Sequence, residues 1–175
     1  MTAGPPRWLE AAAEPAPHYH QGVSRWLAPG VALLAVAWLL LIVAAPVLWI
    51  PVAGAMYAAG SFICHQLPER SFHVQGAQLP VCARCLGLYC GGAFGSVMGA
   101  SAVVRHRISG GHLLLARASR WRWTVAAAIP TLATGVLEWG FGWPISNTVR
   151  AAAALPFGLA VAFVVVSAMA TLHYE

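Results

Sequence analysis

Long apolar segments alternate with short polar ones along most of the chain. The apolar segments cover residues 31–50, 86–104, 123–141 and 151–172. About 20 apolar residues are enough for a helix to cross roughly 30 Å of hydrocarbon. The pattern therefore predicts an all-α membrane protein whose single domain, residues 27–175, contains four transmembrane helices.

The first apolar segment continues beyond the length of one span. Pro46 and Pro51 favour a kink or a stop at its far end, yet apolar residues continue to Ile63. We therefore expect residues 52–63 to form a separate short helix, which either lies at the membrane interface or re-enters the bilayer. A polar loop that contains cysteine and histidine, residues 64–85, follows it.

The first 26 residues differ from the rest of the chain. Residues 1–26 are polar and rich in proline, and they lack the apolar core and small-residue cleavage site of a secretory signal. They are predicted to form a flexible N-terminal tail.

The composition indicates a membrane protein rather than a soluble domain. Hydrophobic residues make up 59% of the chain and charged residues 9%, whereas soluble domains carry about 25% charged residues. The lipid bilayer is therefore the first expected partner. The net charge of +5 does not indicate a nucleic-acid partner, because five of the ten arginines lie between Arg105 and Arg122, as in a cytoplasmic loop.

The arginines also predict the orientation of the chain in the cell membrane. Seven of them lie in the tail and in the loop between the second and third spans, and three lie on the opposite side. Because cytoplasmic loops carry the excess of positive residues, both termini are expected in the cytoplasm. The Cys/His loop is then extracytoplasmic.

Glycines recur every four residues along the second span, at Gly87, Gly91, Gly95 and Gly99. This spacing places them near one face of a helix, where a second helix can approach closely. The face is therefore a candidate surface for a homo-oligomer.

All four cysteines of the chain lie between Cys64 and Cys90. Cys82 and Cys85 form a Cys-x-x-Cys pair that can grip a tetrahedral metal ion, and Cys64 with His65 could complete four ligands. His73 is the alternative fourth ligand, because adjacent residues rarely ligate one ion together. A set of three cysteines and one histidine suits zinc, although ligand type alone does not exclude iron or copper.

A disulfide is the competing interpretation of the same cysteines. An extracytoplasmic compartment is oxidising, so Cys64 could pair with Cys82 or Cys85. The Cys82–Cys85 pair could also carry out thiol exchange. Cys90 is expected to be a buried thiol outside the ligand set.

Charged and polar side chains near the cysteines are candidates for binding or catalysis. Arg70 and Arg84 could receive a lipid-like anionic ligand, and Tyr89 lies close to them in the sequence. In the alternative interpretation Arg70 pairs with Glu69 or a loop carbonyl, and Arg84 reaches the lipid headgroups.

Glu138 is the remaining candidate. A carboxylate inside an apolar span is costly and often functional, and its natural partner is Arg150 or Arg84. Alternatively, Glu138 is hydrated at the interface beside Trp139.

The cysteine motifs resemble those of a family of small prokaryotic multi-pass membrane proteins that is catalogued as a domain of unknown function. The resemblance extends from Tyr57 to Phe163, and Thr134 stands where that family usually has an acid. The shared pattern is Cys-His-Gln, Arg-Ser-Phe and Cys-x-Arg-Cys-x-Gly-x-Tyr, here Cys64, His65, Gln66, Arg70, Ser71, Phe72, Cys82, Arg84, Cys85, Gly87 and Tyr89. The resemblance implies membership of a family but no activity.

Three functional hypotheses follow from these residues. The first is a membrane protein with a Cys/His transition-metal site at the outer end of the bundle, with zinc as the expected metal. This protein would bind or act on a lipid-like anion. The second is a membrane thiol–disulfide oxidoreductase that uses Cys82 and Cys85. The third is a non-enzymatic transporter or assembly factor, so enzymatic activity itself stays open.

Overall fold

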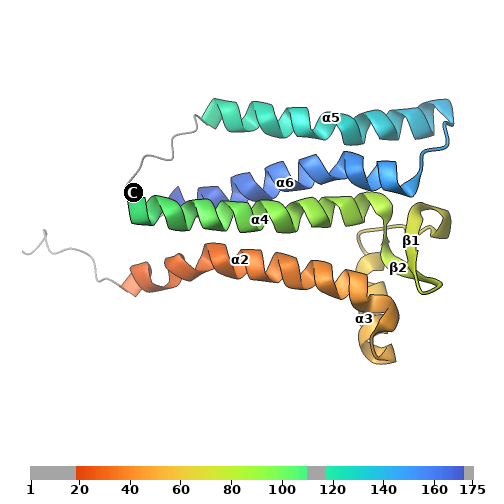
Figure 1. The fold of residues 1–175 in the computed structure, drawn as a ribbon, viewed down its shortest axis with the longest axis horizontal. Helices are drawn as coiled ribbons and strands as arrows, with labels where there is room; N and C mark the ends of the chain where they lie inside the picture. The colour runs from red at the N-terminus through yellow and green to blue at the C-terminus, as the bar shows by residue number, and fades with distance from the viewer. Residues whose placement is uncertain (1–18, 110–116, 172–175) are drawn as a thin grey trace, which may run out of the picture.

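Four long helices lie side by side in the computed structural model, which describes residues 19–109 and 117–171 (Figure 1). Helix α4 lies between α2 and α6, and α5 packs against α6. The bounds are α2 Tyr19–Ala44, α4 Ala83–Ser109, α5 Arg117–Phe141 and α6 Asn147–Thr171. Helix α2 thus begins within the predicted tail of residues 1–26, whose first 18 residues lie outside the described part of the chain.

Three of these helices are long and apolar enough to cross a membrane, over Trp26–Val47, Trp121–Phe141 and Asn147–Met169. Their apolar side chains are largely exposed; Leu33, for example, exposes 71% of its surface. Helix α4 is not among these three, although it has 27 residues. Within the described residues, three of the four predicted spans are therefore supported.

The glycine face of α4 packs against α6 of the same chain. A Cβ atom added at Gly87, Gly91 or Gly95 would collide with backbone carbonyl groups of α6. The opposing face of α6 contributes Gly158, which packs in the same way against the backbone of α4. An intramolecular contact with α6 therefore covers the face that was the candidate surface for a homo-oligomer, and oligomerisation itself stays a prediction.

Substitution of Gly91 by alanine is expected to destabilise the protein by about 1–3 kcal/mol, because the added methyl group forces two helix backbones apart. Gly92 is the matched control. It neighbours Gly91 on the same helix, but a Cβ there meets nothing within 4 Å. Thermal unfolding in detergent should show a lower midpoint for Gly91→Ala and an unchanged or higher one for Gly92→Ala. Equal midpoints would contradict the close contact between α4 and α6.

The end of the bundle opposite the two described chain ends carries a short helix and a hairpin (Figure 1). A 3-10 turn, Ala45–Val47, follows α2, and α3 then covers Ile50–Ser61. This helix matches the short helix expected over residues 52–63. The exposed apolar residues of α3 include Ile50, with 83% of its surface accessible.

The Cys/His loop contains a β-hairpin, so the all-α expectation is wrong at this point. After a 3-10 turn at Pro68–Arg70, strand β1 covers Ser71–Val74 and pairs antiparallel with β2, Ala77–Cys82. Gln75 and Gly76 both have positive φ and form the two-residue turn, as favoured hairpin turns require. The register places Ser71 opposite Cys82.

Strand β2 holds the hairpin against the bundle. Leu79 and Val81 expose 2% and 1% of their surface, and Val81 packs with Ile42, Ala45 and Met56. The burial of these apolar side chains removes their surface from water or lipid headgroups and stabilises the contact. This packing positions the end of β2, and with it the cysteines.

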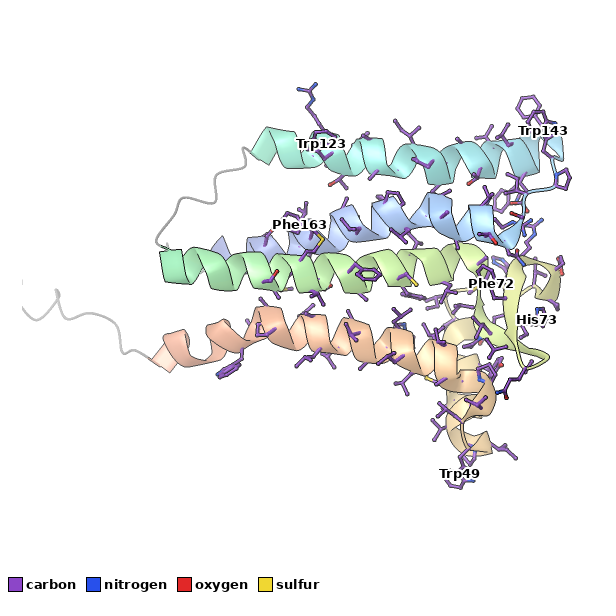
Figure 2. The ribbon with its side chains drawn as sticks, viewed as in Figure 1. Trp49, Phe72, His73, Trp123, Trp143 and Phe163 are labelled. Carbon is purple, nitrogen blue, oxygen red and sulfur yellow. The ribbon has the colours of Figure 1, made fainter. Side chains whose placement is uncertain are left out.

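Exposed tryptophans lie toward both ends of the bundle (Figure 2). Trp49 and Trp143 lie at the hairpin end, whereas Trp123 lies toward the other end of α5. All three expose more than half of their surface, at 75%, 61% and 73% respectively. Tryptophan is enriched at both membrane–water interfaces, so these positions are consistent with a bundle that spans the bilayer.

Candidate functional site

Three cysteine sulfurs converge where the hairpin meets the bundle. Their Sγ atoms all lie within 4.8 Å of one another. Cys64 follows α3, Cys82 ends β2 and Cys85 lies in the first turn of α4. Because α4 begins directly after β2, the Cys-x-x-Cys pair spans the change from strand to helix.

The distances between the three sulfurs are close to the distances between sulfur ligands in a metal centre. Three sulfurs bound to a tetrahedral zinc ion at about 2.3 Å lie roughly 3.8 Å from one another. Only a small closure of the three side chains is therefore needed. Three soft sulfur donors suit zinc, copper(I) or iron, so the residues present fit a transition metal.

The Cys64 sulfur is oriented by backbone N–H groups. It accepts hydrogen bonds from the amide of Cys82 at 3.0 Å and from the amide of Gln66 at 3.5 Å. Gln66 has a φ of 48°, a left-handed conformation that directs its amide back toward the sulfur. Partners of this kind orient ligands at metal sites.

The side chain of Gln66 holds the loop in this conformation. Its Nε2 donates to the carbonyl of Tyr57 at 2.8 Å and to that of Pro80 at 2.7 Å. Its own backbone carbonyl accepts a hydrogen bond from Gln78 Nε2 at 2.5 Å. The Tyr57 hydroxyl donates to the backbone carbonyl of Gln78. These bonds connect α3, the Cys64 loop and β2, a role of Gln66 that the sequence motif alone did not reveal.

Cys82 and Cys85 interact directly. A hydrogen bond from the Cys85 side chain lowers the pKa of Cys82 to about 5, against the opposing effect of burial. Cys82 is therefore the thiolate of the pair near neutral pH. Metal ligation requires deprotonated sulfur, so this thiolate favours the binding of a cation.

The predicted histidine ligands do not join the three sulfurs. His65 and His73 are exposed, and neither belongs to the group within 4.8 Å. Figure 2 shows His73 on the hairpin at the end of the molecule. Cys90 is half-buried on α4 and also lies outside the group.

Tyr89 lies on the sulfur side of α4 and not among the arginines. Its ring makes an edge contact with Trp38, with ring centroids 6.3 Å apart. Both aromatic rings pack against the apolar cluster that contains Cys64. Tyr89 therefore forms part of the apolar wall around the three cysteines.

A second polar site is centred on Glu138, whose side chain is only 6% exposed. Arg150 Nη2 lies 2.6 Å from Glu138 Oε1, and Arg84 Nη2 lies 2.8 Å from Oε2. Arg70 Nε lies 3.4 Å from Oε1. We call these four side chains the arginine cluster. They come from the 3-10 turn before β1, from α4, from α5 and from α6.

The arginine cluster agrees with the expectations for two of its arginines and adds a third. Arg84 and Arg150 were both candidate partners of Glu138, and both contact it. Arg70, for which an anionic ligand and a pairing with Glu69 or a loop carbonyl were the two interpretations, reaches Glu138. Arg150 was expected only as a partner of Glu138 and was not predicted as a site residue in its own right.

Asn147 connects the arginine cluster to the hairpin. Its Oδ1 accepts a hydrogen bond from Arg150 Nη1 at 2.6 Å, and its Nδ2 donates to the Ser71 carbonyl at 3.0 Å. Ser71 is opposite Cys82 in the hairpin register. Arg84 itself lies between Cys82 and Cys85 in sequence, so the two sites share one turn of chain.

Comparison with known proteins places the chain among membrane proteins. Residues 64–164 match the model of a family described as "Predicted membrane protein (DUF2085)". An uncharacterized protein of Methanocaldococcus jannaschii is 44% identical over 50 residues, which are 29% of this chain and 32% of that protein. An uncharacterized protein of Methanothermobacter thermautotrophicus is 53% identical over 30 residues, 17% of this chain and 27% of that protein.

The matched region therefore spans about a third or less of the length of these curated relatives. No solved structure matches the chain.

Proposed function

This chain belongs to the DUF2085 family of predicted membrane proteins, and we propose that it binds a transition-metal ion, zinc first, through Cys64, Cys82 and Cys85. The observation that carries the proposal is the convergence of three sulfurs from three different elements within 4.8 Å. When bound, the metal supplies a cross-link between these elements and a Lewis acid at the end of the bundle.

A metal accounts for the three sulfurs better than a disulfide does. A disulfide uses two sulfurs and leaves the third buried beside it without a covalent role. A tetrahedral ion uses all three and has one position left. His65 or His73 fills that position if the exposed loop closes, and a small ligand from outside the chain fills it otherwise.

The bilayer is the proposed setting, with α4 as a fourth span between α2 and α6. The arginine distribution supports a cell-membrane location with cytoplasmic termini and an extracytoplasmic hairpin. The exposed apolar surface of α3 supports contact of this helix with lipid, either at the interface or in a re-entrant position. A lipid-like anionic ligand near Arg70 and Arg84 completes the proposal.

A green fluorescent protein fused after Glu175 is expected to fluoresce, because it folds in the cytoplasm. The matched experiment is an alkaline phosphatase fusion at the same residue, which should be inactive. An insertion of the phosphatase into the Gln75–Gly76 turn should be active. The reverse pattern of activities would contradict the proposed orientation.

Thiol–disulfide exchange is a second candidate function, because the pKa of Cys82 is lowered to about 5. A depressed pKa in a Cys-x-x-Cys pair is typical of reactive thiols. In this function Cys82 attacks a disulfide of a protein partner, and Cys85 resolves the mixed disulfide as the partner leaves in its reduced form.

Metal analysis of the purified full chain, beside thiol counting, separates the two functions. Metal binding predicts about one equivalent of metal per chain and thiols that are protected until a chelator is added. An absence of metal, together with one disulfide that opens with reductant, would support exchange and overturn metal binding.

A further inference from the structure

The arginine cluster carries more positive charge than nearby acidic residues neutralise. It contains three guanidinium groups, which stay charged at any physiological pH, and one carboxylate. The chain has no Asp, and Glu69 is the other acidic residue within residues 19–109 and 117–171. Glu69 is exposed and makes no ion pair with another described residue. The cluster therefore keeps an excess of about two positive charges.

The carboxylate cannot satisfy the donors of the cluster. Each guanidinium has five N–H donors, and Glu138 has two oxygens, each of which already meets two guanidinium nitrogens. Arg84 contributes only Nη2 to these contacts, and its Nε is buried with no hydrogen-bond partner in the described part of the chain. A buried donor without a partner is costly, so an acceptor is missing from this site.

A cluster that only attached α5 to its neighbours would not need three arginines around one carboxylate. One arginine paired with Glu138 would join α5 to its neighbours, and each further guanidinium adds repulsion between like charges. Three arginines from separate elements are the expected arrangement when a second anion shares the cluster. Glu138 then aligns the guanidinium groups, and the second anion neutralises the remaining charge.

We propose that Arg70, Arg84 and Arg150, aligned by Glu138, form a binding site for a phosphate group. The proposal rests on the proposed function and specifies the chemistry of its anionic ligand. The planar fork of arginine matches phosphate oxygens in pairs, and the excess charge equals that of a phosphate monoester near neutral pH. A carboxylate ligand would leave one positive charge uncompensated.

The most exposed arginine gives the site its open side. The Arg70 side chain is 32% exposed, against 18% for Arg84 and 10% for Arg150. Among the described residues, its Nη atoms have no hydrogen-bond partner, because its contact with Glu138 uses Nε. The cluster lies where α4 and α6 begin and α5 approaches its end. The exposed Trp49 and Trp143 lie at this same hairpin end of the bundle (Figure 2). Both a lipid headgroup and a soluble phosphate could reach Arg70 there.

The test is phosphate binding by the purified full chain, in two arms at constant ionic strength. The first titrates inorganic phosphate in a neutral detergent, with chloride as the reference. The second compares nanodiscs of phosphatidylcholine with nanodiscs that also contain phosphatidic acid. We expect saturable binding in the first arm for a soluble ligand, and in the second arm alone for a lipid headgroup.

The decisive variant is Arg70→Gln, which removes one charge and the two free Nη groups on the open side of the cluster. Its affinity for the bound form of phosphate should fall roughly tenfold or more, the loss that charge-assisted hydrogen bonds produce. Arg122→Gln is the matched control, because it removes the same charge from an exposed residue at the other end of α5. It should leave the affinity unchanged. Arg70→Lys should fall between the wild type and Arg70→Gln, since it keeps the charge and loses the fork.

Two outcomes would overturn the proposal. One is no saturable binding of phosphate in either arm, which would mean that the cluster only attaches α5 to the rest of the bundle. The other is an equal loss in Arg70→Gln and Arg122→Gln, which would mean unspecific attraction between charges. Metal content measured on the same samples keeps the two proposals apart. A chain with metal and without phosphate binding defeats this inference alone, and a chain with phosphate binding and without metal defeats the metal site alone.

Discussion

Substitution of Cys82 by serine is expected to abolish stoichiometric metal binding. Cys82 provides the thiolate with the lowered pKa and lies within 4.8 Å of both other sulfurs. Loss of a group that hydrogen-bonds to a metal-ligating residue already weakens metal binding by about 10–100-fold. Loss of the ligating residue itself should weaken binding by more than that. Elemental analysis of the purified protein, in parallel with the wild type, measures the effect.

Cys90→Ser is the matched control for Cys82→Ser. Cys90 is a half-buried cysteine on α4 that lies outside the three-sulfur group. Its substitution should leave the metal content at the wild-type value. Size-exclusion profiles in detergent show whether both variants remain folded. Equal metal contents in two folded variants would contradict the assignment of Cys82 as a ligand.

Substitution of Glu138 by glutamine should produce the largest loss of stability among single changes at the arginine cluster. It leaves three guanidinium groups around a neutral amide and without a counter-charge. Removal of one partner from a buried ion pair costs about 3–5 kcal/mol. We expect a value near the lower limit, because Arg70 and Arg84 keep 32% and 18% of their side-chain surface in contact with solvent.

Glu69→Gln provides the comparison for Glu138→Gln, since Glu69 is exposed and forms no ion pair with a described residue. Thermal or denaturant unfolding in detergent should separate the two variants clearly. The double variant Glu138→Gln/Arg150→Met should recover part of the loss, because residues in one network are not additive. Identical unfolding midpoints for the two glutamine variants would show that Glu138 carries no such role.

The helices could be predicted because each signal is contained in one stretch of sequence. Continuous apolar runs indicate α2, α5 and α6, and the prolines near residue 50 indicate the break before α3. The glycine spacing correctly indicated a close helix contact in α4. It could not indicate whether the second helix belongs to the same chain or to another copy.

The hairpin could not be predicted because its stability comes from elsewhere in the fold. Its strands have four and six residues, and Pro80 inside β2 argues against a strand. Leu79 and Val81 are buried, and Val81 packs with residues of α2, the Ala45–Val47 turn and α3, a contact that strand propensity does not report. The Gln75–Gly76 turn was the only local signal.

The cysteine site and the arginine cluster also differ in how far local sequence could predict them. The proximity of the three cysteines followed from the Cys-x-x-Cys pair and the absence of cysteine elsewhere. The arginine cluster required four elements to converge, with Arg70 and Arg150 at 80 positions from each other in the sequence. Nothing in the local pattern around Arg150 distinguishes a cluster member from an interfacial arginine.

X-ray absorption at the edge of the bound metal tests the central claim most directly. The purified full chain should give a metal with three sulfur neighbours, at about 2.3 Å if it is zinc, and one lighter neighbour. A metal surrounded by nitrogen and oxygen alone, or a chain with no stoichiometric metal, would contradict the proposed site at Cys64, Cys82 and Cys85.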